Sequence, residues 1–130
     1  MKKFSFPFAV IIGVFLLLAF VSACANLSSP PTPTLEPLAA QGKQLVSQYC
    51  ATCHALEPNK TIVGPSFAGV ATRAETRMPD TSAREYIELS ILDPSAFIVP
   101  GYPNGMPNDF GKKLSGDDFN AIVAFLLTLK

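Results

Sequence analysis

Cys50-Ala51-Thr52-Cys53-His54 is the stretch that decides how this chain folds. Its spacing, C-x-x-C-H, is the attachment signature of a c-type haem. The two thiols can add across the two vinyl groups of one haem, which brings the adjacent histidine under the iron as an axial ligand. The sequence therefore predicts one covalent haem c, bound through Cys50 and Cys53 and ligated by His54.

Other interpretations of two cysteines at this spacing fit poorly. A structural zinc site needs four ligands, and outside the motif only Cys24 can supply a thiol or an imidazole. A redox-active dithiol of the thioredoxin type begins a helix within a βαβ pattern, and no such pattern follows. Because the iron uses the only histidine, a separate Ser–His or Cys–His catalytic pair is excluded as well.

The N-terminal segment is typical of an exported protein. Two lysines precede an apolar run over residues 4–20, and small residues then lead to Cys24. This order describes a secretory signal peptide, which we assign to residues 1–23. The junction at residues 21–24, V-S-A-C, resembles the lipobox of bacterial lipoproteins. In that family the cysteine becomes the mature N-terminus and carries acyl chains, which implies lipidation of Cys24.

Two alternatives remain for this segment. Residues 4–23 are about as long as a bilayer-spanning helix, so the segment could stay uncleaved as a membrane anchor. Ordinary cleavage near Ala23 would instead leave Cys24 free. Lipoprotein and uncleaved anchor agree that the domain is exported and attached to a membrane, on its periplasmic or outer face. With lipid on Cys24 and haem on the other two cysteines, no disulfide is expected.

Composition divides the rest of the chain into a tether and one domain. Residues 24–37 contain four prolines among Ser, Thr and Asn, which predicts a polyproline-like or disordered tether. Residues 38–130 form the working domain, with eight basic and nine acidic residues. This near-neutral balance, without a basic run or basic–aromatic stripe, predicts no nucleic-acid binding.

Three helices are predicted in the domain. The first covers residues 38–49 and runs into the haem motif. The second opens at a capping box over residues 82–85 and ends before Pro94. The third opens at a similar box over residues 115–118 and continues to Lys130. The remaining segments are rich in Gly and Pro and are predicted as loops, so the fold class is all-α.

Over residues 38–130 the pattern resembles a class I cytochrome c. The resemblance implies that Gly42, eight positions before Cys50, lies where the first and last helices cross, against the aromatic Phe125. It also implies that the Pro65 carbonyl, in the G-P-S-F stretch, accepts a hydrogen bond from the haem histidine. That bond would fix the tautomer of His54 and leave Nε2 for the iron.

Residues 86–106 are similar to the cytochrome c domains fused to the copper-bearing subunit of some haem–copper oxidases. The copper domain is not present in this chain, so only the haem module is carried over and not the oxidase chemistry. Met106, in the turn N-G-M-P, matches the family's sixth ligand in flanking sequence and in distance from His54. Met78 lies in a polar R-M-P stretch and is interpreted as a surface or gap-filling side chain.

Four aromatic and five cationic residues each have more than one possible role. Four aromatics either line an apolar haem pocket or belong to an ordinary core; they are Phe67, Phe97, Tyr102 and Phe110. Five cations either donate to a haem propionate, form a docking rim or are solvated surface; they are Lys60, Arg73, Arg77, Lys112 and Lys113.

The sequence predicts an electron-transfer protein and not an enzyme. Its partners would be membrane redox complexes: a quinol-oxidising complex, a terminal oxidase or a photosynthetic reaction centre. It would act as a tethered carrier or as a fixed subunit, without a small-molecule substrate. One alternative is a ligand-binding haem, sensor or peroxidase-like, which requires that Met106 does not coordinate iron. The other is a structural lipoprotein whose haem mainly fills the core.

Overall fold

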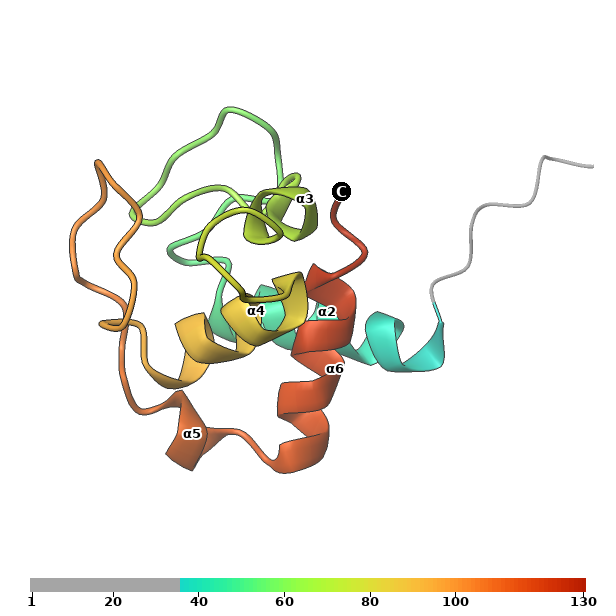
Figure 1. Ribbon diagram of the computed structural model, residues 1–130. Coiled ribbons are helices and arrows are strands. Elements are labelled where there is room, and N and C mark those ends of the chain that lie inside the picture. Colours follow the sequence, from blue (N-terminus) through green and yellow to red (C-terminus); the bar gives the residue numbers. More distant parts are fainter. Residues whose placement is uncertain (1–35) are drawn as a thin grey trace, which may run out of the picture. The chain divides into compact units, whose positions relative to one another are not determined.

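The computed structural model describes residues 36–130 as a helical domain (Figure 1). Its elements, in chain order, are α2 (Pro37–Tyr49), α3 (Val70–Ala74), α4 (Ala83–Leu92), α5 (Phe110–Lys113) and α6 (Gly116–Leu126). There is no strand among residues 36–130, which confirms the all-α class. The predicted signal peptide, Cys24 and all but the last two residues of the predicted tether lie outside the described residues.

The centre of the fold is the crossing of α2 and α6; in Figure 1, α6 passes in front of α2. A Cβ atom added at Gly42 would lie 1.8 Å from the Ala121 carbonyl oxygen and 2.8 Å from Phe125 Cβ. The two helices therefore touch through backbone at this point, and only glycine fits there. Gly42 and Phe125 meet at the crossing, as the resemblance implied.

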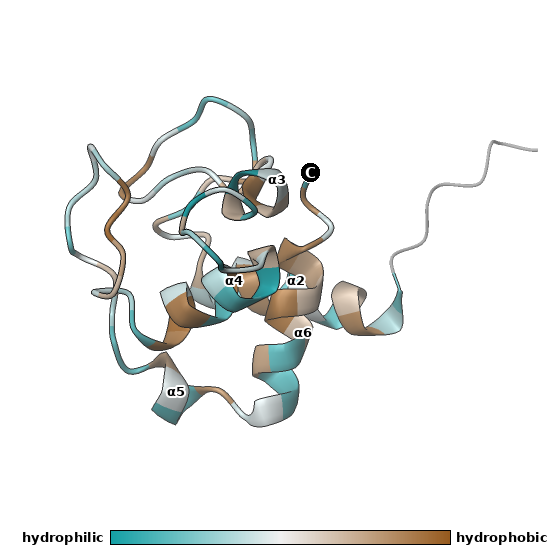
Figure 2. Cartoon of the chain, in the orientation of Figure 1, coloured by the Kyte–Doolittle hydropathy of each residue, from teal (hydrophilic) through white to brown (hydrophobic). Residues whose placement is uncertain are grey.

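The core lies on the inward faces of α2, α4 and α6, where the apolar residues gather (Figure 2). Val46 of α2 and Val123 of α6 are fully buried, and Ile87 of α4 packs in the same cluster. In Figure 1 the long segments 50–69 and 93–109 extend to the left of and above α4, away from this crossing. Helices α2, α4 and α6 thus form the packed core, and the segments 50–69 and 93–109 extend from it.

The helix ends agree with the sequence in part. α2 begins at Pro37, which the sequence placed in the tether, because the fixed φ of proline suits a first helical turn. α6 ends at Leu126, so its predicted continuation to Lys130 is wrong. The chain turns there instead: the Thr128 hydroxyl donates to the Phe125 carbonyl over 2.7 Å. The Leu129 carbonyl accepts from the backbone of α3.

Two short helices were predicted as loop. α3 and α5 have five and four residues, too few for an apolar period of 3.6 residues to repeat. None of the helices in residues 36–130 is long and apolar enough to cross a bilayer.

A reciprocal capping box begins α4. Ser82 accepts a hydrogen bond from the Glu85 backbone N–H (3.3 Å), and Glu85 Oε2 accepts from Ser82 N (2.8 Å). We expect Ser82→Ala to lower the free energy of unfolding by about 1 kcal/mol. Bonds from Ser82 lower the pKa of Glu85, so its stabilisation is present above the ordinary carboxyl pKa and lost in acid.

Denaturant unfolding of both proteins at two pH values checks this. The gap between them should shrink from about pH 7 to about pH 3, because protonated Glu85 no longer accepts these bonds. A gap that is unchanged or wider at low pH would contradict the reciprocal cap.

Candidate haem site

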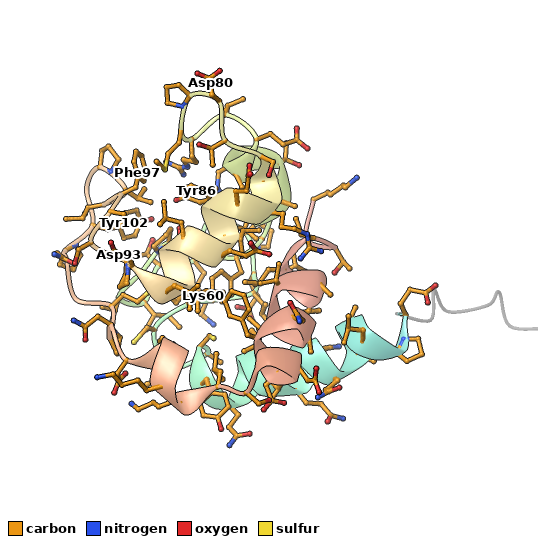
Figure 3. The ribbon with its side chains drawn as sticks, turned by 60° about the horizontal axis from the view of Figure 1, so that its bottom comes forward. Lys60, Asp80, Tyr86, Asp93, Phe97 and Tyr102 are labelled. Carbon is orange, nitrogen blue, oxygen red and sulfur yellow. The ribbon has the colours of Figure 1, made fainter. Side chains whose placement is uncertain are left out.

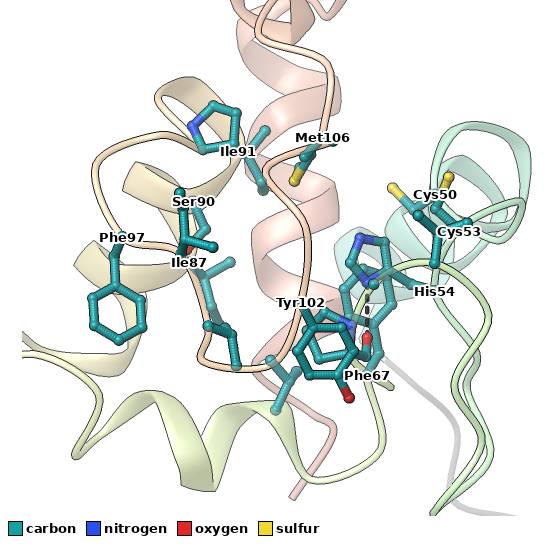
Figure 4. Close-up of a pocket in the computed structure, with 18 of the residues that line it drawn as sticks. Cys50, Cys53, His54, Phe67, Ile87, Ser90, Ile91, Phe97, Tyr102 and Met106 are labelled. Atoms are coloured by element: carbon teal, nitrogen blue, oxygen red, sulfur yellow. Dashed lines mark hydrogen bonds between the residues drawn. The ribbon is translucent and has the colours of Figure 1, made fainter.

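The haem motif forms a tight turn at the end of α2. Cys50 is the C-cap, and its N–H bonds to the Val46 carbonyl over 2.9 Å. The N–H groups of Cys53 and His54 both bond to the Cys50 carbonyl, each over 3.0 Å. This winding gathers the two thiols and the imidazole beside one cavity, as Figure 4 shows.

The cavity is enclosed by segments that are distant in sequence. Besides the motif, its walls come from the loop at residues 63–67, from α3 and Arg77, from α4, from the segment 94–107 and from α5 and α6. Most of the lining is apolar; α4, α5 and α6 contribute Tyr86, Ile87, Ile91, Phe110 and Ile122. A planar apolar macrocycle with polar edge groups matches such a lining.

His54 is oriented by two contacts. Its Nδ1 donates a hydrogen bond to the Pro65 carbonyl over 2.8 Å, the bond that the resemblance implied. Its ring stacks on Phe67, with centroids 4.4 Å apart and planes 7° apart. Burial lowers the pKa of His54, opposed by the bond to Pro65, so the imidazole is held neutral. A neutral imidazole with Nδ1 engaged presents Nε2 as a metal ligand.

Gly64 lies against the same imidazole, which the sequence did not reveal. A Cβ atom at this position would be 2.3 Å from His54 Cε1, closer than any real contact. The only signal in the sequence was the place of Gly64 just before Pro65. Why that place needs a glycine depends on where the ring lies, which is a contact through space.

We therefore expect Gly64→Ala to displace the His54 ring or the loop beneath it. Overpacking of this kind costs about 1–3 kcal/mol, and the visible spectrum of the haem protein should show weakened or altered iron ligation. Gly116→Ala is the matched control, because a Cβ atom there meets nothing within 4 Å. Equal spectra and equal stabilities for the two variants would contradict the contact.

Of the two methionines in residues 36–130, only Met106 lines the cavity. Figure 4 shows its thioether and the His54 imidazole reaching the cavity from different segments of the chain. Met78 packs against the core as a partly buried side chain, consistent with gap filling. The geometry thus brings Cys50, Cys53, His54 and Met106 to one place.

The four predicted aromatics all line the cavity: Phe67, Phe97, Tyr102 and Phe110. Sequence reasoning missed Tyr86, whose ring meets Phe97 edge-on with centroids 5.8 Å apart. Figure 3 shows Tyr86, Phe97 and Tyr102 gathered at one side of the domain. Tyr86 lies in α4, and its ring partner Phe97 lies beyond the end of that helix, so no local pattern connects the two.

The five cations have different surroundings. Arg73 and Arg77 line the cavity, and both also border a second, polar pocket with Lys60. Lys60 itself pairs with Glu57 over 3.5 Å. Lys113 pairs with Asp109 over 2.8 Å. Within residues 36–130, neither Lys112 nor Lys113 lines the cavity.

The residues present fit a covalently attached haem. Two thiols, one neutral imidazole and one thioether share an apolar cavity, which is the donor set that a c-type haem uses. Burial, and secondarily the neighbouring Cys53, raises the pKa of the Cys50 thiol to about 11.

This fold and this site define a small all-α, haem-binding protein of the c type. The chain belongs to the cytochrome c family: the family model described as Cytochrome c matches residues 39–130. It therefore binds haem c covalently, with Cys50 and Cys53 at the spacing of the attachment motif, and is a haem electron-transfer protein. No curated protein matched the chain.

Proposed function

We propose that this chain is a membrane-anchored monohaem cytochrome c that passes single electrons between respiratory or photosynthetic complexes. Cys50 and Cys53 hold the haem, and His54 and Met106 are the two axial ligands. The observation that carries this proposal is the convergence of His54 and Met106 on one apolar cavity. When bound, the haem supplies reversible one-electron chemistry at its iron.

The side chains around the site suit electron transfer better than ligand binding. His54 is held by Pro65 and Phe67, so we expect its ring to move little when the iron changes charge. The soft thioether of Met106 favours the reduced state and raises the potential. An apolar lining excludes water, which reduces reorganisation on electron transfer. Among the described residues, His54 is the only histidine, so no second histidine can assist peroxide chemistry.

Visible and near-infrared spectra of the wild-type protein, produced with a cytochrome c maturation system, test the ligation. We expect low-spin iron in both redox states and the weak far-red sulfur-to-iron band in the oxidised state. The reduced protein should bind carbon monoxide slowly or not at all. High-spin iron with rapid and complete carbon monoxide binding would overturn the proposal and make a ligand-binding haem the better assignment.

The membrane attachment rests on the N-terminal sequence. Residues 1–23 supply the signal and Cys24 the acylation site, so the domain would lie on the periplasmic or outer face of a membrane. The twelve residues 25–36 before α2 would, if extended, reach up to roughly 37 Å from the bilayer, at about 3.1 Å per residue. That reach suits contact with a quinol-oxidising complex, a terminal oxidase or a reaction centre, as a tethered carrier or a fixed subunit.

Mass spectrometry of the mature N-terminus checks this prediction. We expect the chain to begin at an acylated Cys24, and the acyl mass to be absent from a Cys24→Ser variant. The lipid anchor would be contradicted by a chain that retains residues 1–23 with an unmodified Cys24, or by one cleaved elsewhere.

A further inference from the structure

The loop at residues 64–69, here called the proximal loop, carries both groups that orient His54. Its Pro65 carbonyl accepts the Nδ1 hydrogen bond, and its Phe67 ring stacks on the imidazole. Neither residue can do this unless the loop itself is held. The position of the imidazole therefore depends on what fixes the proximal loop.

On one side the proximal loop is fixed to the haem motif. The Gly64 N–H bonds to the Cys53 carbonyl over 2.9 Å, and the Phe67 N–H bonds to the Ala55 carbonyl over 2.8 Å. These bonds move with the motif. They define the distance between loop and motif, and the motif is itself joined to α2 at Cys50.

On the other side the proximal loop runs into α3, where the Val70 N–H bonds to the Phe67 carbonyl over 2.9 Å, and the guanidinium of Arg73 holds the two neighbouring carbonyls. Arg73 Nη2 donates to the Ser66 carbonyl over 2.6 Å, and Nη1 donates to the Ala68 carbonyl over 2.5 Å. The two carbonyls flank Phe67, so the fork of Arg73 spans the residue that stacks on His54. The planar guanidinium can grip two acceptors at once, which a lysine ammonium cannot do in the same fixed geometry.

Arg73 stands on an anchored element. It lies in α3, where the Ala71 N–H bonds to the Leu129 carbonyl over 3.0 Å and Ala74 is fully buried. Gly69 makes room for it: its φ is +69°, and a Cβ atom there would approach Arg73 Nη1 to 3.0 Å. Sequence reasoning had weighed Arg73 only as a propionate donor, a docking cation or surface.

We propose that Arg73 is a positioning residue for the histidine ligand of the iron. By holding the carbonyls on either side of Phe67 to α3, it keeps the Pro65 carbonyl aligned with His54 Nδ1. This inference rests on the proposed function, in which His54 ligates iron. Arg73 acts through the backbone of the proximal loop and not by contact with the iron.

His54 is the only histidine of the chain, so selective ¹⁵N-histidine labelling gives the NMR signals of that residue alone. Exchange of the Nδ1 proton with solvent in the reduced haem protein reports opening of its bond to Pro65. We expect exchange to be about tenfold or more faster in Arg73→Gln and in Arg73→Lys, the loss of a charge-assisted hydrogen bond. Arg84→Gln, an exposed cation of α4 that does not line the cavity, is the control and should leave the rate unchanged.

The two Arg73 variants distinguish the planar, two-pronged donor from the positive charge: lysine keeps the charge without the planar guanidinium, and glutamine removes both. Faster exchange in Arg73→Gln alone would assign the effect to charge and overturn the proposal, and so would unchanged exchange in both. Backbone amide exchange is measured on the same samples, because a general loss of stability would speed exchange throughout the backbone. The proposal requires faster exchange at His54 Nδ1 without that general increase. If Arg73→Gln does not fold, Arg73→Lys and the control still decide.

Failure of the ligand assignment would look different. The ring protons of an iron-bound imidazole lie over the haem and are shifted strongly upfield by its ring current. If wild-type His54 lacks that shift, His54 is not the ligand, whatever the exchange rates are. With the shift present, the comparison of Arg73 variants tests the positioning role by itself.

Discussion

Met106→Ala is expected to convert a six-coordinate electron carrier into a haem protein with an open iron position. Met106 lines the cavity that contains His54, and the only other methionine of residues 36–130 does not line it. Alanine removes the thioether and leaves space on that side. The far-red sulfur-to-iron band should disappear, and the reduced protein should bind carbon monoxide rapidly.

The potential should fall in the same variant, because a soft ligand that favours reduced iron has been lost. We expect a decrease on the order of 0.1 V, within the roughly 0.8 V that axial ligands span. Met78→Ala is the control: its side chain packs against the core, so it should lose some stability and keep the band and the potential.

A far-red band that survives Met106→Ala would show that another group ligates the iron. Loss of the band in Met78→Ala, with retention in Met106→Ala, would exchange the roles of the two methionines. Both results are read from spectra of the intact haem protein, so they do not depend on identifying a redox partner.

Attachment of the haem could be predicted from sequence because its determinants are local. The C-x-x-C-H spacing places two thiols and an imidazole within one turn, and the structure winds that turn from the Cys50 carbonyl. Met106 required the resemblance, since nothing in residues 104–107 alone says which cavity the thioether enters. Helices α2, α4 and α6 were predicted because each repeats its apolar face and two begin at a Ser that can cap them. The structure forms the full capping box at α4, whereas at α6 Ser115 accepts from the Asp118 N–H without the return bond.

What the sequence did not reveal depends on contacts through space. Gly64 must be small because an imidazole from ten residues earlier lies on it. Arg73 donates hydrogen bonds to two carbonyls of the proximal loop, and no local sequence pattern specifies the path of that loop. The end of α6 at Leu126 is similar: residues 127–130 have helical propensity, but the Leu129 carbonyl bonds to α3 instead. Tertiary hydrogen bonds outweigh a weak local preference there.

The distribution of buried residues explains why the haem matters to the fold. The described domain has no buried polar or charged residue, and several buried positions are alanines, such as Ala39, Ala74 and Ala121. Small side chains let helices approach but bury little apolar area. A domain of this size has a limited core of its own. The haem that the cavity accepts therefore adds apolar contact among the segments that line it.

The second large effect is expected for Gly42→Ala at the crossing of α2 and α6. In an ordinary helix this change stabilises by about 1 kcal/mol. Here the new Cβ would lie 1.8 Å from the Ala121 carbonyl oxygen and 2.5 Å from its carbonyl carbon. These are backbone atoms, so the helices themselves must separate. We expect a net loss of about 3 kcal/mol or more, beyond the usual cost of overpacking.

The damage should extend to the haem, because α2 ends at Cys50 and carries the attachment motif. A low yield of haem-bound protein and a lowered midpoint in guanidinium, followed by the Soret band, would measure it. Ala40→Ser, an exposed position of the same helix, controls for substitution in α2. A double variant with Phe125→Ala tests the cause: the nearest clash is with the backbone of Ala121, so removing the ring should not restore stability. Rescue by Phe125→Ala would mean that the side chain, and not the helix backbone, limits the approach.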